Sequence, residues 1–274
     1  MKIIVSDVIG FCPGVNEAVY ACKKGYYCLG EVIHNSETID RLIASGVKFI
    51  NEEDIDKIDL KDKDVVIRAH GISPQVYEKL EKSGANIINK TCPNVAKVQL
   101  YSLNPDYKTV IIGDKDHPEI KGILGYAPKD TMVWSKDISE DIIKNVAENY
   151  PRINLIGQTT LLESTYKRIG KLFKKYNKHT YINNTLCPET RKRQKALKKL
   201  CKKVDFIIIV GDKKSANTNQ LQVLVTEMKK PSIIVGTAHE LPKDIKYKKV
   251  GIASGASTPR HLVDEVVVYL YQGS

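Results

Sequence analysis

Three of the six cysteines in this 274-residue chain, Cys12, Cys92 and Cys187, are each followed by a proline. They are 80 and 95 residues apart, and each follows an apolar, strand-like run and a short polar segment. Proline is favoured at the first helical position, so each cysteine is predicted to stand at a helix N-terminus, where the partial positive charge favours the thiolate. The pattern indicates one three-thiolate site, although three separate, buried strand-end cysteines would also fit.

The other three cysteines are predicted to be structural. Cys201 and Cys22 fall in the apolar stripes of predicted helices, and Cys28 lies in the strand-like run YYCLG. Six cysteines scattered over a chain of this length do not form the dense pattern of a secreted disulfide scaffold. We therefore expect a reducing compartment, with metal binding or catalysis rather than disulfides.

Polar loops that follow strand-like runs recur three times, in two types. The first type carries His34 with Asn35, His117 with Glu119, and Ser215 with Asn217; the second carries His70 with Ser73, Thr159 with Thr160, and Ser257 with Thr258. Backbone N–H groups at helix N-termini, together with imidazole, amide and hydroxyl donors, bind anions well. We therefore expect a shared cavity for phosphate or diphosphate beside the thiolates, although each residue alone is typical of a helix cap.

Alternating strand-like and helical runs must position these loops. Such alternation predicts an α/β fold with mainly parallel sheets and right-handed crossovers. The repeats indicate three small α/β units around a pseudo-threefold axis: residues 13–92, 93–187 and 188–274, the third completed by the N-terminal strand 1–12. Ligands of open α/β sheets bind beyond the carboxyl ends of the strands, so the loops and cysteines should gather there.

Three thiolates leave the identity of the metal open. Structural zinc usually takes four ligands in two closely spaced pairs, and the sequence contains no C-x-x-C, but zinc held by three cysteines and His117 or water would fit. A four-iron four-sulfur cluster normally takes four cysteines, so three would leave one iron open for a substrate. The sequence contains neither of the glycine-rich nucleotide motifs, G-x-x-x-x-G-K-[ST] and G-x-G-x-x-G.

Eight motifs carry a resemblance that covers essentially the whole chain. In order they are GFCPGV, GEVIHN, RAHGISP, TCPNV, HPEIKG, GQTTL, NTLC with RKRQ, and GASTP. With these motifs the sequence resembles the 4-hydroxy-3-methylbut-2-enyl diphosphate reductases, the last enzymes of the methylerythritol phosphate route to isoprenoids. The resemblance implies three α/β domains around a central iron–sulfur cluster, and a two-electron reductive dehydroxylation that yields isopentenyl diphosphate and dimethylallyl diphosphate.

The resemblance also implies roles for site residues. Cys12, Cys92 and Cys187 would hold a 4Fe-4S cluster whose open iron binds the substrate hydroxyl. The diphosphate would be bound by His34, His70, His117, Ser215, Asn217 and Ser257. Thr159 and Glu119 would lie near the hydroxyl with His117, and Glu119 would pass protons; alternatively, Glu119 only complements a helix dipole. The chain departs from the family at Ala216, where one hydroxyl contact is missing.

A net charge of +11 indicates an anionic partner. Residues 191–203 hold eight Lys or Arg on an amphipathic segment, which is either a solvated face or a docking surface for an acidic electron donor such as flavodoxin or ferredoxin. With 7% aromatic residues and no zinc-finger spacing, the sequence gives nucleic-acid binding no support beyond charge. The sequence has no apolar run of roughly 18 residues and no cleavable signal, which predicts a cytoplasmic protein without a membrane partner. A zinc-bound or metal-free phosphate-binding protein is the alternative to the reductase.

Overall fold

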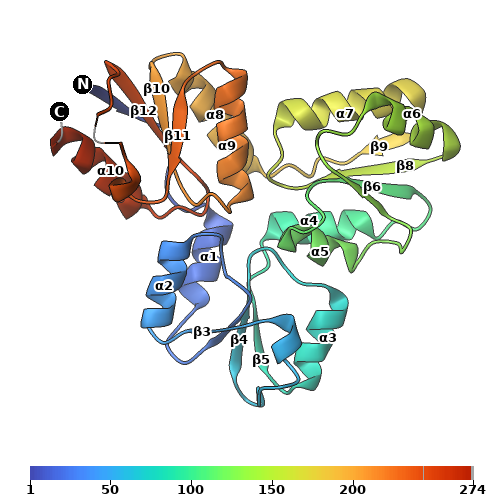
Figure 1. Cartoon of the computed structure of the whole chain (residues 1–274). Helices are drawn as coiled ribbons and strands as arrows, with labels where there is room; N and C mark the ends of the chain where they lie inside the picture. Colours follow the sequence, from blue (N-terminus) through green and yellow to red (C-terminus); the bar gives the residue numbers. More distant parts are fainter. Residues whose placement is uncertain (243, 273–274) are drawn as a thin grey trace. The chain divides into compact units, whose positions relative to one another are not determined.

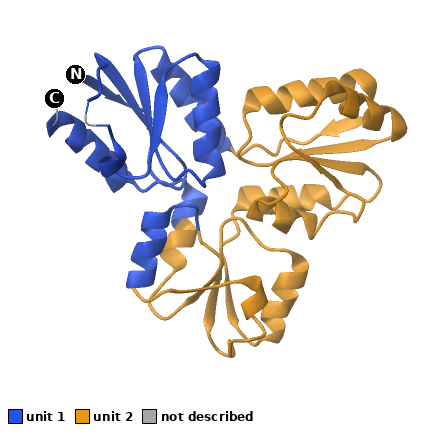
Figure 2. Cartoon of the chain, in the orientation of Figure 1, with its two compact units in different colours: residues 1–16, 33–44, 188–274 blue, residues 17–32, 45–187 orange. Residues whose placement is uncertain are grey.

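The structure, a computed structural model, describes residues 1–242 and 244–272. The chain forms two compact units: unit 1 contains residues 1–16, 33–44 and 188–274, and unit 2 contains residues 17–32 and 45–187 (Figure 2). One parallel four-stranded sheet lies in unit 1 and two lie in unit 2. The predicted α/β class with parallel sheets is therefore confirmed. The three domain ranges given above stay a prediction.

Unit 1 is built on a sheet of strand order β1-β12-β10-β11 (Figure 1). Its elements are β1 (Lys2–Val5), α2 (Ser36–Ala44), α8 (Pro188–Cys201), β10 (Phe206–Val210), α9 (Ala216–Glu227), β11 (Ser232–Val235), the 3-10 helix η2 (Ala238–Glu240), β12 (Lys249–Ser254) and α10 (Arg260–Gln272); α1 (Pro13–Ala21) begins here and ends in unit 2. Strand β1 pairs with β12, so the N-terminal strand lies in the same sheet as the C-terminal strands. Helix α10 covers one face of this sheet, and α8 with α9 covers the other.

Unit 2 contains two sheets, of strand order β3-β2-β4-β5 and β7-β6-β8-β9. The first sheet and its helices comprise β2 (Tyr27–Leu29), β3 (Lys48–Ile50), the 3-10 helix η1 (Glu52–Asp54), β4 (Asp64–Ile67), α3 (Pro74–Lys82) and β5 (Asn86–Asn89). The second comprises α4 (Pro93–Ser102), β6 (Lys108–Ile112), α5 (Pro118–Leu124), β7 (Met132–Trp134), α6 (Glu140–Asn149), β8 (Ile153–Gly157), α7 (Glu163–Tyr176) and β9 (Thr180–Ile182). Within the described ranges, no helix combines the length and the apolar character needed to cross a membrane.

Burial on both faces explains the consecutive apolar residues at the end of the central strand β6. In β6, Val110 and Ile112 pack in the cluster formed with α6 and α7, whereas Ile111 packs on the opposite face with α4 and α5. All three side chains are fully buried. Successive strand residues point to opposite faces, and helices on both faces favour apolar residues at consecutive positions. Each such side chain stabilises the fold by about 1.5–3 kcal/mol.

The polar loops follow the carboxyl ends of the strands, as the sequence predicts. His70 follows β4, His117 follows β6, Thr159 follows β8, Ser215 follows β10 and Ser257 follows β12. Parallel strands of one sheet end at the same edge, so the loops of each sheet share that edge. The fold therefore holds the polar loops of each unit close to one another.

Candidate functional site

Each of the three Cys-Pro cysteines directly precedes a helix. Helices α1, α4 and α8 begin at the prolines that follow Cys12, Cys92 and Cys187, and Cys92 is the N-cap residue of α4. Proline fits this first helical position because its missing N–H would have no partner inside the helix. The predicted helix starts are therefore confirmed, and each half-buried cysteine stands where helix dipoles favour a negative charge.

The same backbone hydrogen bond fixes all three cysteines. In each case the cysteine N–H donates to a carbonyl oxygen in a loop of the second type. The three bonds join Cys12 to Ala256, Cys92 to Ala69 and Cys187 to Thr159, each at 3.0 Å. Each thiol is thus positioned by the main chain of the loop after the neighbouring strand.

Unit 2 brings Cys92 and Cys187 to one side chain, although they are 95 residues apart in sequence. The amide nitrogen Nδ2 of Asn94 lies 3.6 Å from Sγ of Cys187 and 3.9 Å from Sγ of Cys92. Cys12 belongs to unit 1. A shared site for all three thiols therefore stays a prediction, supported in unit 2 by this pair.

Of the remaining cysteines, Cys28 and Cys201 are buried as predicted, whereas Cys22 is half-buried and lies just beyond the helix in which it was expected. Cys28 in β2 and Cys201 at the end of α8 are completely buried, and burial raises the pKa of the Cys201 thiol. Cys22 follows the last residue of α1, and its thiol donates to the carbonyl of Ala18 at 3.4 Å. A hydrogen bond with Cys28 lowers the pKa of Cys22, and the same contact raises the pKa of Cys28.

A buried carboxyl group lies at the edge of the second sheet of unit 2. Glu119, in the first turn of α5, is 2% exposed. The hydroxyl of Thr159 lies 2.6 Å from its Oε2, and the backbone N–H of Thr159 donates to its Oε1 at 2.7 Å. Burial raises the pKa of Glu119, and the two hydrogen bonds from Thr159 oppose that shift. The result is a carboxyl group that holds its proton to a higher pH than an exposed glutamate.

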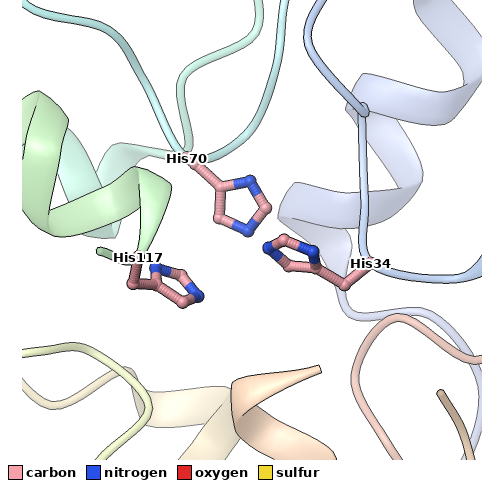
Figure 3. Close-up of side chains that lie close together, drawn as sticks. All are labelled: His34, His70 and His117. Carbon is pink, nitrogen blue, oxygen red and sulfur yellow. The ribbon is translucent and has the colours of Figure 1, made fainter. Parts of the chain in front are cut away.

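Two histidine rings lie close together at the start of α5. His117 caps α5, with its Nδ1 accepting the N–H of Glu119 at 3.1 Å, so in the neutral ring the proton is on Nε2. The His70 ring lies edge-on to it, with ring centroids 5.4 Å apart and planes at 84° (Figure 3). The imidazole donors of these two loops therefore point into one region of unit 2.

In unit 1 the predicted serines meet at the ends of β10 and β12. Ser215 caps α9 by accepting the N–H of Thr218 at 3.4 Å, and its Oγ lies 3.3 Å from Oγ of Ser257. The Ser257 hydroxyl also contacts the backbone carbonyl of His34, at 3.1 Å. Three loops that are far apart in the sequence therefore converge on one point.

Asn217, two residues after Ser215, is a buried polar residue of α9. Its side chain is 5% exposed, and neither its Nδ2 nor its Oδ1 has a hydrogen-bond partner within the described residues; the same holds for Oγ1 of Thr218. A buried polar group without a partner costs about 1–3 kcal/mol. A bound polar ligand would remove that cost, because the amide could donate to it and accept from it.

Two other polar loop residues act as helix caps. The Oδ1 atom of Asn35 accepts both the N–H and the hydroxyl of Thr38, at 2.9 and 2.7 Å, at the start of α2. The hydroxyl of Ser73 accepts the N–H of Val76 at 3.3 Å, at the start of α3. For these two residues the capping alternative is confirmed.

A cavity of about 200 Å³ in unit 1 is lined by three carboxylates and one lysine, Lys213, so its lining is poorly suited to an anion. Its carboxylates are those of Glu37, Asp212 and Glu240, and Asp212 already accepts the N–H and the hydroxyl of Ser36, at 3.1 and 2.8 Å. Negative charge in the cavity walls would repel a phosphate. Anion binding by Ser215, Ser257 and Asn217 in unit 1 therefore stays a prediction that this cavity does not replace.

The basic segment 191–203 does not lie entirely on the surface. Arg193 is 3% exposed and donates to the carbonyls of Gly10 at 2.5 Å and Ser254 at 3.3 Å, which holds the loop that precedes Cys12. The prediction that the whole basic segment forms a solvated face or a docking surface is wrong for Arg193. The charge of an arginine in an amphipathic helix does not reveal on which face of the helix it lies. The six lysines of α8 and the turn after it are exposed: Lys192, Lys195, Lys198, Lys199, Lys202 and Lys203.

Comparison with known proteins gives consistent matches along the whole chain. A family model described as LytB protein matches residues 3–271. The 4-hydroxy-3-methylbut-2-enyl diphosphate reductase of Treponema denticola is 38% identical over 290 residues, covering 100% of both chains, and that of Thermoanaerobacter sp. is 35% identical over 285 residues, covering 97% and 96%.

Two solved structures share the fold. The E-1-hydroxy-2-methyl-but-2-enyl-4-diphosphate reductase of Plasmodium falciparum matches with a TM-score of 0.88 and 29% identity, over 98% of this chain and 87% of that one. A structure of (E)-4-hydroxy-3-methyl-but-2-enyl diphosphate reductase, described as the terminal enzyme of the non-mevalonate pathway, matches with a TM-score of 0.68 and 33% identity, over 99% and 100%.

Proposed function

The chain belongs to the LytB protein family, and on this premise we propose that it reduces 4-hydroxy-3-methylbut-2-enyl diphosphate. The observation that carries the proposal is the match of the whole chain to relatives with this named activity. The reaction uses two electrons and two protons. The C–O bond of the alcohol breaks, one proton leaves with the oxygen as water, and the other adds to carbon, which gives isopentenyl diphosphate or dimethylallyl diphosphate.

The donor set fits an iron–sulfur cluster. Thiolates are the usual protein ligands of these clusters, and Cys12, Cys92 and Cys187 each stand before a helix. In unit 2 the sulfurs of two of them share one amide donor, which suits sulfur atoms that carry negative charge. When bound, a 4Fe-4S cluster would supply electrons and an iron without a protein ligand, a Lewis acid for the substrate hydroxyl.

The polar loops suit the diphosphate. In unit 1 the serine pair and the buried, unsatisfied amide of Asn217 offer neutral donors near the start of α9. In unit 2 the rings of His70 and His117 offer imidazole donors. We assign diphosphate binding to these residues together with His34, because helix N-termini and such donors stabilise phosphate oxygens.

Glu119 is assigned the transfer of a proton to the departing hydroxyl. Its raised pKa keeps the proton available, and Thr159 fixes the orientation of the carboxyl group through two hydrogen bonds. The carbonyl of Thr159 also accepts the N–H of Cys187, so one residue ties the acid to a cluster ligand. The Nδ1 of His117 accepts the Glu119 N–H, which fixes the orientation of the ring that we assign to the substrate.

An acidic electron carrier such as flavodoxin or ferredoxin is assigned to the exposed lysines of α8. The chain carries a net charge of +11, and this helix begins at the residue after Cys187. Opposite charges speed the encounter of two proteins and orient them. We place the enzyme in the cytoplasm, where reducing conditions keep cysteine thiols available for a cluster.

Anaerobic purification with iron and sulfide analysis tests the proposal. The protein should be brown, with about four iron per chain, and should reduce the allylic diphosphate. Cys92→Ser should lose the cluster and the activity, whereas Cys201→Ser, at a buried structural cysteine, should keep both. A colourless wild-type protein that binds zinc or no metal after cluster reconstitution would leave only the phosphate-binding alternative.

A further inference from the structure

Asn94 contacts two of the three thiols, and the sequence motifs suggest no role for it. It is the second residue of α4, directly after the proline that follows Cys92, and its side chain is half-buried. Its Nδ2 reaches both Cys187 and Cys92, at 3.6 and 3.9 Å from the sulfur atoms. An amide nitrogen carries two hydrogens, so one Asn94 side chain can donate to both sulfurs at once.

We propose that Asn94 sets the reduction potential of the cluster by donating hydrogen bonds to two of its cysteine ligands. This inference rests on the proposed iron–sulfur function. Reduction adds negative charge to the cluster and its sulfur ligands, and a hydrogen-bond donor stabilises that added charge. Asn94 therefore favours the reduced state and raises the potential, which makes the cluster easier to reduce.

At the start of α4, the Cys92 sulfur depends on side chains for a hydrogen-bond donor. Cys92 is the N-cap residue, and its side chain accepts no capping hydrogen bond from the helix backbone. The next residue, Pro93, has no N–H to offer. The amide of Asn94 therefore adds a side-chain hydrogen bond to the Cys92 sulfur, where no backbone N–H of the helix makes a capping bond.

The test is a redox titration of the cluster-loaded protein under anaerobic conditions, with iron content measured for each sample. Asn94→Leu removes both donors, and Asn94→Asp replaces them with acceptors of nearly the same shape. We expect the leucine variant to shift the ratio of oxidised to reduced cluster about tenfold at a fixed potential. For a one-electron couple this is about 59 mV toward lower potential. The aspartate variant should shift further because it adds a negative charge.

Matched variants separate this role from a structural one. Asn149→Asp makes the same chemical change at an exposed position of α6 and should leave the potential unchanged. Asn94→Ser keeps a donor on a shorter side chain, so it should give an intermediate potential. It provides the comparison if Asn94→Leu and Asn94→Asp bind less iron than the wild-type protein. Equal potentials in wild type and every iron-retaining Asn94 variant would overturn the proposal for Asn94 while leaving the cluster intact. A wild-type protein without iron would instead overturn the proposed function.

Discussion

Replacing Glu119 with glutamine tests the proton-transfer role with little change in structure. Glutamine has the shape of glutamate, and its Oε1 can accept the Thr159 N–H that now donates at 2.7 Å. Its Nε2 can donate to the Thr159 hydroxyl, now 2.6 Å from Oε2. Both contacts survive, so the free energy of unfolding should change by no more than about 1 kcal/mol.

Turnover should respond far more strongly than stability. A positioned general acid contributes about 10²–10⁴-fold, so kcat of Glu119→Gln should fall by that factor, which is about 2.7–5.4 kcal/mol in the activation free energy. The KM for the diphosphate should change little, because Glu119 is not assigned to binding it. Steady-state kinetics with a chemical reductant measure both quantities. Turnover of the variant close to the wild-type rate would refute the role.

The pH dependence gives a second readout of the same group. Burial raises the pKa of Glu119, so the proton-donating form is lost, and kcat should fall, as pH rises through that raised pKa. Between the unfolded and folded pKa values the native protein binds more protons here than the unfolded chain, so this group's contribution to stability decreases as pH rises. Thr159→Val removes the hydroxyl that opposes the shift and should move the fall in kcat to higher pH. An unchanged pH profile in Glu119→Gln would contradict the assignment.

Two further predictions concern binding. Asn217→Ala should raise the KM for the diphosphate about 10-fold, a loss of about 1.4 kcal/mol, without loss of stability, because the buried amide has no partner among the described residues. Asn219→Ala, at an exposed position of the same helix, is the control, and equal KM values in the two variants would contradict the assignment of Asn217. The double variant Lys195→Glu, Lys199→Glu should raise the KM for an acidic protein donor and flatten its salt dependence, with no effect on turnover driven by a small chemical reductant. Equal losses of activity with the protein donor and with the chemical reductant would show that those lysines do not bind the donor.

Much of the fold is predictable because its rules are local. An apolar run such as FIIIV predicts a strand buried on both faces, and the helix start at Pro93 follows from the chemistry of proline alone. The order of strands and helices then limits the sheets to parallel pairing with crossovers. The positions of the polar loops follow from the same rules, because parallel strands end at one edge of their sheet and each polar loop follows the end of a strand.

The sequence could not predict contacts that depend on long-range packing. Asn94 lies 93 residues from Cys187, and no pattern indicates that its amide reaches that sulfur. Arg193 looks like its exposed neighbours in a basic helix until β12 and the loop at Gly10 are placed around it. That the Asn217 amide has no hydrogen-bond partner among the described residues likewise becomes apparent only from the packed structure.

The backbone hydrogen bond shared by the three cysteines bears on how such a protein can evolve. The acceptors at positions 69, 159 and 256 are main-chain carbonyls, and the side chains there differ, being alanine, threonine and alanine. Because each thiol is placed by atoms that every residue type possesses, these loops can exchange side chains without displacing a thiol. The chemistry around the thiols is therefore free to diversify under selection, while their placement is inherited with the fold.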